Sequence, residues 1–378
     1  MGGSRLVGWL AAFAAAWSLG PAPARGLWQS TPIARLTIEG RYDDDLLAEG
    51  GGAAAILAPS LGWRLRKPTV DLQASYGIDV FTYARLLPNT GGENQRLRAS
   101  QTVDFDPRTR FVLRQAAEWL YDPTALARPG VVRTGGEVLF LEADADVVRR
   151  MTKRLRAGLG ARAERSWFHA AGAEDGTTVA PRALAGLALS PRDDLQGRYR
   201  LQIFAFDRAA GWTAHEPAIG YARLLTPSTR LGFELGAAIL AGPGGVTHLQ
   251  PTGRAELSWR LPRFTLTAGG ERVLVGAAGL AEPLWASHGT LHGDYRITEP
   301  LTASLGLALF RNDRAAGGRV AVGLVAEVGA EYALGEGFAA RLVVRRVAQD
   351  GEGALGVDLS RNIYAAGLAW RFDGPPPR

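Results

Sequence analysis

The feature that most constrains this chain is the alternation of apolar and polar residues, which is the dominant pattern from residue 33 almost to the end. Between residues 97 and 105, for example, Leu97, Ala99 and Val103 fall on one face, whereas Arg98 and Thr102 fall on the other. Successive side chains of a β-strand point to opposite faces, so this period of two predicts strands. Each strand should carry one apolar face and one small or charged face.

Eighteen segments follow this pattern, although 53–66 and 214–225 alternate poorly. We expect strands at 33–41, 53–66, 69–84, 95–105, 109–121, 137–150, 154–168, 178–190, 195–207, 214–225, 230–241, 247–260, 264–275, 284–297, 301–311, 319–332, 338–348 and 358–372. The number is even, as in single-chain bacterial outer-membrane barrels.

The connections between these segments fall into two kinds that alternate along the chain. Every second one is tight, and most of the tight ones contain proline, as at Asp106-Pro107 and Leu261-Pro262. The others are mostly longer and polar or rich in glycine, as at 43–52, 122–136 and 169–177. Short turns at one rim and long loops at the other are typical of an outer-membrane barrel. A soluble sandwich gives no reason for this regularity.

Energetics decide which face meets lipid. An arginine at the bilayer midplane on the lipid face costs roughly 2–4 kcal/mol, so the charged face must look into the lumen. An open sheet edge in hydrocarbon would leave backbone groups unpaired, so the sheet must close. The sequence therefore predicts an all-β, closed, antiparallel up-and-down transmembrane barrel of about 18 strands. The expected lumen-lining residues are Arg98, Arg114, Glu118, Glu142, Arg154, Arg156, Arg162, Arg198, Arg200, Glu234, Arg254, Glu256, Glu327 and Arg341.

The composition excludes several other classes of protein. The absence of cysteine rules out disulfides and thiolate metal sites. Past residue 20 there is no apolar run of about 20 residues, as membrane helices require. Lysine occurs only at positions 67 and 153, so 41 of the 43 basic residues are arginine. These arginines are interleaved with acids along the chain, whereas nucleic-acid readers gather basic charge on one face, so we expect no nucleic-acid partner.

The two ends of the chain indicate export and outer-membrane assembly. Arg5, an uncharged stretch at 6–19 and the small residues Ala22 and Ala24 form the pattern of a secretory signal peptide. We therefore expect a signal peptide at 1–24, a barrel at 25–372 in the bacterial outer membrane, and a periplasmic tail at 373–378. The alternating 363–372 segment resembles the C-terminal strand that the barrel-assembly machinery recognises, although residues 373–378 follow its last aromatic residue.

Aromatic residues near the expected strand ends predict girdles at the two membrane interfaces, because amphipathic rings favour the headgroup level. They occur in four pairs: Trp119 and Tyr121, Trp167 and Phe168, Trp259 and Phe264, and Trp370 and Phe372.

Catalytic and metal-binding patterns are weak. His288 and His292 share a strand face, but four residues of strand separate them by about 13 Å, too far for one metal ion. The Tyr42-Asp43-Asp44-Asp45 segment and the Glu142-x-Asp144-x-Asp146 run lack EF-hand spacing, so Ca²⁺ ligation competes there with solvated acids and luminal ion pairs. We expect no enzyme and no cofactor. A hydrolase at the barrel rim, using His169 or His215 with nearby acids, is an alternative.

A family resemblance suggests what the lumen carries. The Tyr42-Asp43-Asp44-Asp45 loop, Pro59-Ser60-Leu61, Leu72-Gln73-Ala74-Ser75-Tyr76 and the Asp106-Pro107-Arg108-Thr109 turn resemble outer-membrane barrels of exopolysaccharide export systems, over roughly 33–170. The resemblance implies a non-enzymatic, porin-like conduit for a hydrophilic polysaccharide, acidic polymers included, which a periplasmic polysaccharide-export protein would deliver. A general or anion-preferring porin for small solutes is the alternative, because an arginine-rich wall favours anions and an 18-strand barrel can leave an aqueous channel.

Overall fold

The computed structural model describes residues 28–44, 52–84, 91–121, 137–169, 173–276, 279–315, 317–351 and 358–374. These residues form eighteen strands and one short 3₁₀ helix. The strands are β1 (Gln29–Asp43), β2 (Gly52–Lys67), β3 (Val70–Ala84), β4 (Gly91–Asp106), β5 (Thr109–Leu120), β6 (Val138–Arg150), β7 (Leu155–Phe168), β8 (Gly176–Ala188), β9 (Asp193–Phe206), β10 (Trp212–Thr226), β11 (Thr229–Ala241), β12 (Thr247–Arg260), β13 (Phe264–Val275), β14 (Leu284–Arg296), β15 (Leu301–Arg314), β16 (Arg319–Gly335), β17 (Phe338–Gly351) and β18 (Leu359–Asp373). The helix η3 (Pro243–Gly245) lies between β11 and β12.

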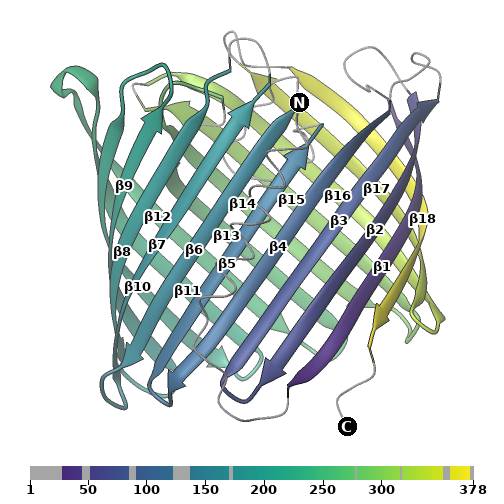
Figure 1. Cartoon of the computed structure of the whole chain (residues 1–378), viewed down its shortest axis with the longest axis horizontal. Helices are drawn as coiled ribbons and strands as arrows, with labels where there is room; N and C mark the ends of the chain where they lie inside the picture. The colour runs from purple at the N-terminus through teal and green to yellow at the C-terminus, as the bar shows by residue number, and fades with distance from the viewer. Residues whose placement is uncertain are drawn as a thin grey trace.

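Each strand pairs antiparallel with its neighbours in sequence, and β1 pairs with β18, so the sheet closes on itself. Figure 1 shows the tilted strands around a single barrel, with β1 beginning and β18 ending at the lower rim. The predicted fold class is confirmed, and each of the eighteen expected segments corresponds to one strand. No helix in the described ranges is long and apolar enough to cross a membrane.

The tight turns gather at one rim, which is therefore the periplasmic one. Backbone hydrogen bonds close them, as where Ile297 N donates to Leu301 O at 2.9 Å. At the turn between β16 and β17, Glu336 adopts φ 49° between two glycines that also have positive φ. Glycine tolerates this left-handed geometry, which explains the Gly335-Glu336-Gly337 sequence.

The outer surface of the barrel carries exposed apolar side chains at alternate positions of nearly every strand. Leu61, Leu159, Leu235 and Leu249 are 66–70% exposed, which no water-soluble sheet would leave uncovered on this scale. Aromatic pairs lie near the rims, as where Trp259 and Phe264 make an edge contact with centroids 5.5 Å apart. The closed sheet and its apolar exterior place the protein in the bacterial outer membrane.

One part of the wall departs from this regular pattern. The upper ends of β13 and β14, which we call the inward hairpin (residues 273–276 and 279–286), lean into the lumen. Leu274 and Trp285 belong to a buried cluster that also contains Phe204 of β9, Trp212 of β10 and Leu240 of β11. Because Phe204 lies on the same strand face as Arg198 and Arg200, this cluster sits inside the barrel.

Two further contacts carry the inward hairpin across the lumen to β8 and its preceding loop. A Cβ on Gly276 would stand 3.4 Å from the Cβ of Thr178, and Glu174 N donates to Gly279 O at 3.0 Å. The long connection at 122–136 lies outside the described residues, as do the expected signal peptide and residues 375–378 of the tail.

Candidate functional site

The luminal face of β6 to β13 carries an array of arginine–carboxylate pairs, which we call the chamber cluster. Arg198 of β9 pairs with Glu234 of β11, spanning the strand between them. Arg200 Nε donates to Glu216 Oε2 at 2.8 Å, and Gln202 donates to the other oxygen of the same carboxylate. A planar guanidinium can bind carboxylates through two N–H groups, so these pairs fix side chains on neighbouring strands relative to one another.

Arg182 of β8 connects the most acids. Its Nη2 donates to Asp144 Oδ1 at 2.7 Å and to Asp146 Oδ2 at 2.6 Å, both on the luminal face of β6. All three side chains are less than a quarter exposed. Arg182 therefore occupies the place between two carboxylates that a calcium ion would need, and the acids of this run serve as luminal ion pairs.

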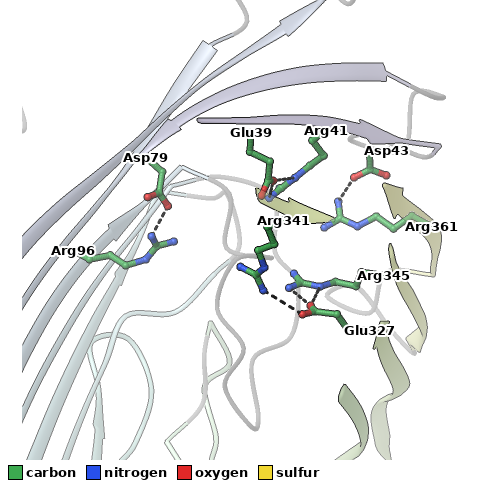
Figure 2. Close-up of polar contacts among 9 residues, drawn as sticks. All are labelled: Glu39, Arg41, Asp43, Asp79, Arg96, Glu327, Arg341, Arg345 and Arg361. Atoms are coloured by element: carbon green, nitrogen blue, oxygen red, sulfur yellow. Dashed lines mark hydrogen bonds and ion pairs between the residues drawn. The ribbon is translucent and has the colours of Figure 1, made fainter. Parts of the chain in front are cut away.

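A second group of ion pairs lies on the luminal face of β1, β3, β4, β16, β17 and β18, and we call it the closure-side cluster. Figure 2 shows the Glu327 carboxylate beside both Arg341 and Arg345. The carboxylate lies 3.7 Å from Arg341 Nη2 and accepts a 2.7 Å hydrogen bond from Arg345 Nε. In the same view Arg361 and Asp43 approach to 3.1 Å near the upper rim.

The same close-up shows two further pairs of this cluster, Arg41 with Glu39 at 2.9 Å and Arg96 with Asp79. Figure 2 thus shows that this wall too is held by charges that face the interior.

Beneath the inward hairpin, the chamber cluster borders a cavity of about 540 Å³, which we call the chamber. Arginines and acids of β7 to β13 form much of its wall, whereas Phe140, Phe206, Val273 and Leu274 contribute apolar surface. A cavity with guanidinium groups on one part of its wall and apolar side chains on another suits a solute that has an acidic group and an apolar body.

The structure places the residues expected to line the lumen as follows. Thirteen of the fourteen lie on luminal faces, and twelve of these make ion pairs. Further pairs are Arg98 with Glu118 at 3.0 Å, Arg156 with Asp194 at 2.9 Å, Arg162 with Glu142 at 3.3 Å and Arg254 with Glu256 at 3.5 Å. The pairs of Arg198, Arg200, Glu234, Glu327 and Arg341 are given above, and Arg114 is the thirteenth luminal residue. Arg154 lies in the tight turn before β7, on the periplasmic rim. Whether these side chains govern permeation stays a prediction.

Several luminal residues were missed by the sequence reasoning, notably Arg182, Glu216 and Glu271. Arg182 lies between Ala180 and Leu184 on the face opposite Val179 and Ala183, so strict application of the alternation would have found it. The pairing of Arg182 with acids of β6 could not have been predicted, because these residues come together only in the folded barrel, across the intervening strand β7. Glu271 differs in this respect, because its partner His288, 3.2 Å away, lies directly opposite it on the next strand of the chain.

The histidines do not assemble the hypothetical rim hydrolase among the described residues. His215 faces outward, and its Nδ1 lies 2.6 Å from the Tyr199 hydroxyl. Asp207 pairs with Arg165 at 2.7 Å, and Asp175 accepts a hydrogen bond from Phe168 N. His169 is exposed at the end of β7. Within the described ranges, no group of three or more His, Asp or Glu side chains could hold a metal ion.

Charge in the lumen is not fully paired. In the described part of the chain, Arg114, Arg230, Arg260 and Arg296 lie on luminal faces with no carboxylate oxygen within 4.0 Å of their guanidinium groups. The last three adjoin tight turns and so line the periplasmic mouth. Luminal carboxylates are nearly all paired, and Glu331 is an exception. The excess of unpaired guanidinium groups gives the mouth a positive potential.

No family model matches the chain, and no curated protein matches it. Among solved structures, the outer membrane protein OpdK from Pseudomonas aeruginosa is similar, with 12% identity, a TM-score of 0.49, and coverage of 91% of this chain and 99% of that one. OccK9 (OpdG) from the same organism has the same four values. OccAB4 from Acinetobacter baumannii has 11% identity, a TM-score of 0.47, and coverage of 91% and 98%. At these identities and TM-scores the likeness decides nothing about the solute, and the closed outer-membrane barrel rests on this chain's own strand pairing and apolar exterior.

Proposed function

We propose that the protein is a non-enzymatic outer-membrane channel for small hydrophilic solutes and that it prefers anions. The observation that carries the proposal is the asymmetry of the luminal charges. Among the described residues, ion pairs use nearly all of the luminal carboxylates, while Arg230, Arg260 and Arg296 at the periplasmic mouth have no carboxylate partner. Fixed positive charge along an aqueous pore lowers the barrier for anions and raises it for cations.

Selectivity in a planar bilayer tests this proposal. Under a KCl gradient, the reversal potential of the native channel should show that chloride is more permeant than potassium. In the variant R230A/R260A/R296A the ratio should fall by roughly two- to five-fold, because three charges leave the mouth. The matched control is Arg149→Ala, which removes a charge from the outward face of the same rim and should leave the ratio unchanged. A native channel that passes potassium as readily as chloride would contradict the proposal.

The exopolysaccharide conduit stays an alternative that rests on the sequence resemblance. The inward hairpin favours the small-solute channel over it, because residues 273–276 and 279–286 pack against the inner face of β8 to β11 and so take up part of the lumen that a polymer would need. Deleting the gene distinguishes the two. Loss of surface polymer with intact synthesis would support export, whereas unchanged polymer and slower uptake of small anions would support the channel.

A further inference from the structure

We propose that the seam between the upper halves of β12 and β13 is a lateral portal, which connects the chamber with the outer leaflet of the membrane. It would admit amphipathic acids, molecules with an anionic head group and an apolar body. This route is additional to the axial channel proposed above, and it rests on the geometry of the wall.

The pairing of β12 with β13 stops halfway up the wall. It extends from Arg260 with Thr265 to Gly253 with Arg272, although β12 continues to Thr247 and β13 to Val275. On its other side β12 pairs with β11 along its length, and β13 pairs with β14 up to Val275. Residues 247–252, roughly 20 Å of strand, therefore have a strand neighbour on one side only.

This interrupted seam lies within the lipid-facing belt. Leu235, directly opposite Gly253 in the register, is 66% exposed on the outer surface. Leu249, inside the unpaired stretch, is 69% exposed. An opening that begins beside Leu235 and passes Leu249 thus faces acyl chains rather than bulk water.

Both sides of the seam reach the chamber. Thr252 and Gly253 of β12, Val273 to Val275 of β13 and the following Gly276 all line the cavity, so the point where the two strands separate is part of its wall. Arg254 lies next along β12, and Leu274 lies beside the cavity in the apolar cluster. An amphipathic acid would find a guanidinium group and apolar side chains close together on entering.

In the described part of the wall, the side chains with buried polar atoms that lack hydrogen-bond partners include His248 at the seam, Trp285 in the inward hairpin and Asn312 on β15. Trp285 is 2% exposed and Asn312 is 1% exposed, yet the indole Nε1 and both amide atoms of Asn312 make no hydrogen bond. The Nε2 atom of His248, in the unpaired stretch of β12, is also buried without a partner. Trp285 belongs to the inward hairpin and lies opposite Asp313 of β15, whereas Asn312 lies opposite Ala286 and points to the other face of the sheet. Buried polar atoms need hydrogen-bond partners, which water or the head group of a ligand would supply here.

Thiol labelling from the lipid phase tests the portal independently of any ion flow. The chain lacks cysteine, so Val273→Cys gives a single thiol on the chamber wall. In phosphatidylcholine liposomes, N-octadecylmaleimide has its chain confined to the bilayer. It should label Val273→Cys about tenfold faster than Thr290→Cys, which faces the lumen from the fully paired part of β14. Leu249→Cys on the outer surface is the positive control.

A pair of glycine variants locates the route. Gly253 faces outward at the point of separation, and a Cβ there would stand 3.2 Å from Glu234 O. Gly270 faces outward two positions below Arg272, where β12 and β13 are paired, and its Cβ would stand 3.6 Å from His288 O. Gly253→Phe in the Val273→Cys background should slow lipid-phase labelling about fivefold, whereas Gly270→Phe should not.

The water-soluble reagent methanethiosulfonate ethylsulfonate shows that both luminal thiols are present and the protein folded. If Val273→Cys and Thr290→Cys react with it but are labelled equally slowly from the bilayer, the lateral portal is overturned. Equal slowing by Gly253→Phe and Gly270→Phe would likewise overturn the assignment of the route to this seam. Either result would leave the anion preference of the axial channel intact.

Discussion

The barrel closes where β18 meets β1 and separates where β12 meets β13, although all four strands are of similar length. The closing seam is paired continuously from Ile33 with Asp373 to Asp43 with Ile363. The β12–β13 seam is paired only below Gly253. The first seam joins the two ends of the chain, so it must form for the barrel to exist. The second joins neighbours in sequence, so it can open partway without opening the barrel.

At the upper rim, different interactions hold the strands together at the two seams. At the closing seam, Asp43 pairs with Arg361, and Asp44 accepts hydrogen bonds from Asn362, so polar contacts continue the pairing to the rim. At the β12–β13 seam, apolar burial of Leu274 and Trp285 replaces the backbone ladder, together with one side-chain hydrogen bond from Arg272 Nη2 to Gln250 Oε1 at 3.4 Å. Hydrophobic packing is not directional, so it can hold a hairpin in a place that the sheet does not dictate.

The largest expected effect comes from fixing the inward hairpin covalently. The variant T178C/G276C should form a disulfide, because the two Cβ positions are 3.4 Å apart, near the usual separation for a disulfide. Oxidation should slow amide exchange of residues 273–276 by roughly a hundredfold or more, since local opening of the hairpin is then blocked. Exchange measured by mass spectrometry with and without reductant checks this.

The matched control is S258C/T267C, which joins β12 and β13 where they are already paired. Its oxidation should leave exchange of residues 273–276 unchanged. If both disulfides protect the hairpin equally, the two halves of the seam are not independent.

The next largest effect is the release of the hairpin by Trp285→Ala. Truncating a fully buried tryptophan costs about 3–5 kcal/mol, and this cost should fall on the packing of the hairpin rather than on the barrel. We expect faster exchange of residues 273–286 and a larger single-channel conductance. Tyr364→Ala on the outer face of β18, where Tyr364 is 48% exposed, should alter neither. An unchanged conductance in Trp285→Ala would show that the hairpin does not limit the pore.

Removing an arginine should destabilise the barrel more in the chamber cluster than in the closure-side cluster. Arg182→Met leaves both Asp144 and Asp146 without their arginine, and it should destabilise the barrel by on the order of 2 kcal/mol. Arg345→Met leaves Glu327 with Arg341 still 3.7 Å away, so its cost should be below about 1 kcal/mol. Urea titration of both variants in detergent micelles measures the difference. Equal midpoints would mean that the acids of β6 find other partners.

The smallest effect concerns pH at the rim of the closing seam. Hydrogen bonds from the backbone N–H and the side-chain amide of Asn362 lower the pKa of Asp44 below its ordinary value of 3.8. A lowered pKa stabilises the contact above that ordinary value, and the stabilisation disappears as pH falls through the lower, folded-state pKa. Amide exchange at Asn362, corrected for the intrinsic pH dependence, should therefore keep its protection at pH 5 and lose it well below pH 4.

Asp44→Ala should lose the protection at Asn362 at both pH values, and Tyr42→Ala on the outer face of the same strand should keep it. Protection that persists in Asp44→Ala would show that the strand pairing alone holds this rim.

Much of the fold could be predicted from local pattern. The alternation located every strand and showed which residues face the lumen, so Arg98, Arg198 and Glu327 could be named without coordinates. Their partners could not, because Arg198 meets Glu234 two strands away and Arg182 meets acids of β6. Those pairings also decide which luminal charges remain unpaired. The basic periplasmic mouth therefore could not be predicted from the sequence either.

The sequence by itself determined that this chain closes into a membrane barrel with arginines inside, because alternation and the cost of charge in lipid are properties of each strand alone. Only the tertiary structure decided that β13 leaves β12 at Gly253 and folds inward. Residues 264–275 and 284–297 alternate like any other strands, so nothing local marks them. Their position depends on apolar surface that β9, β10 and β11 offer across the lumen, and such surface exists only once the barrel has closed.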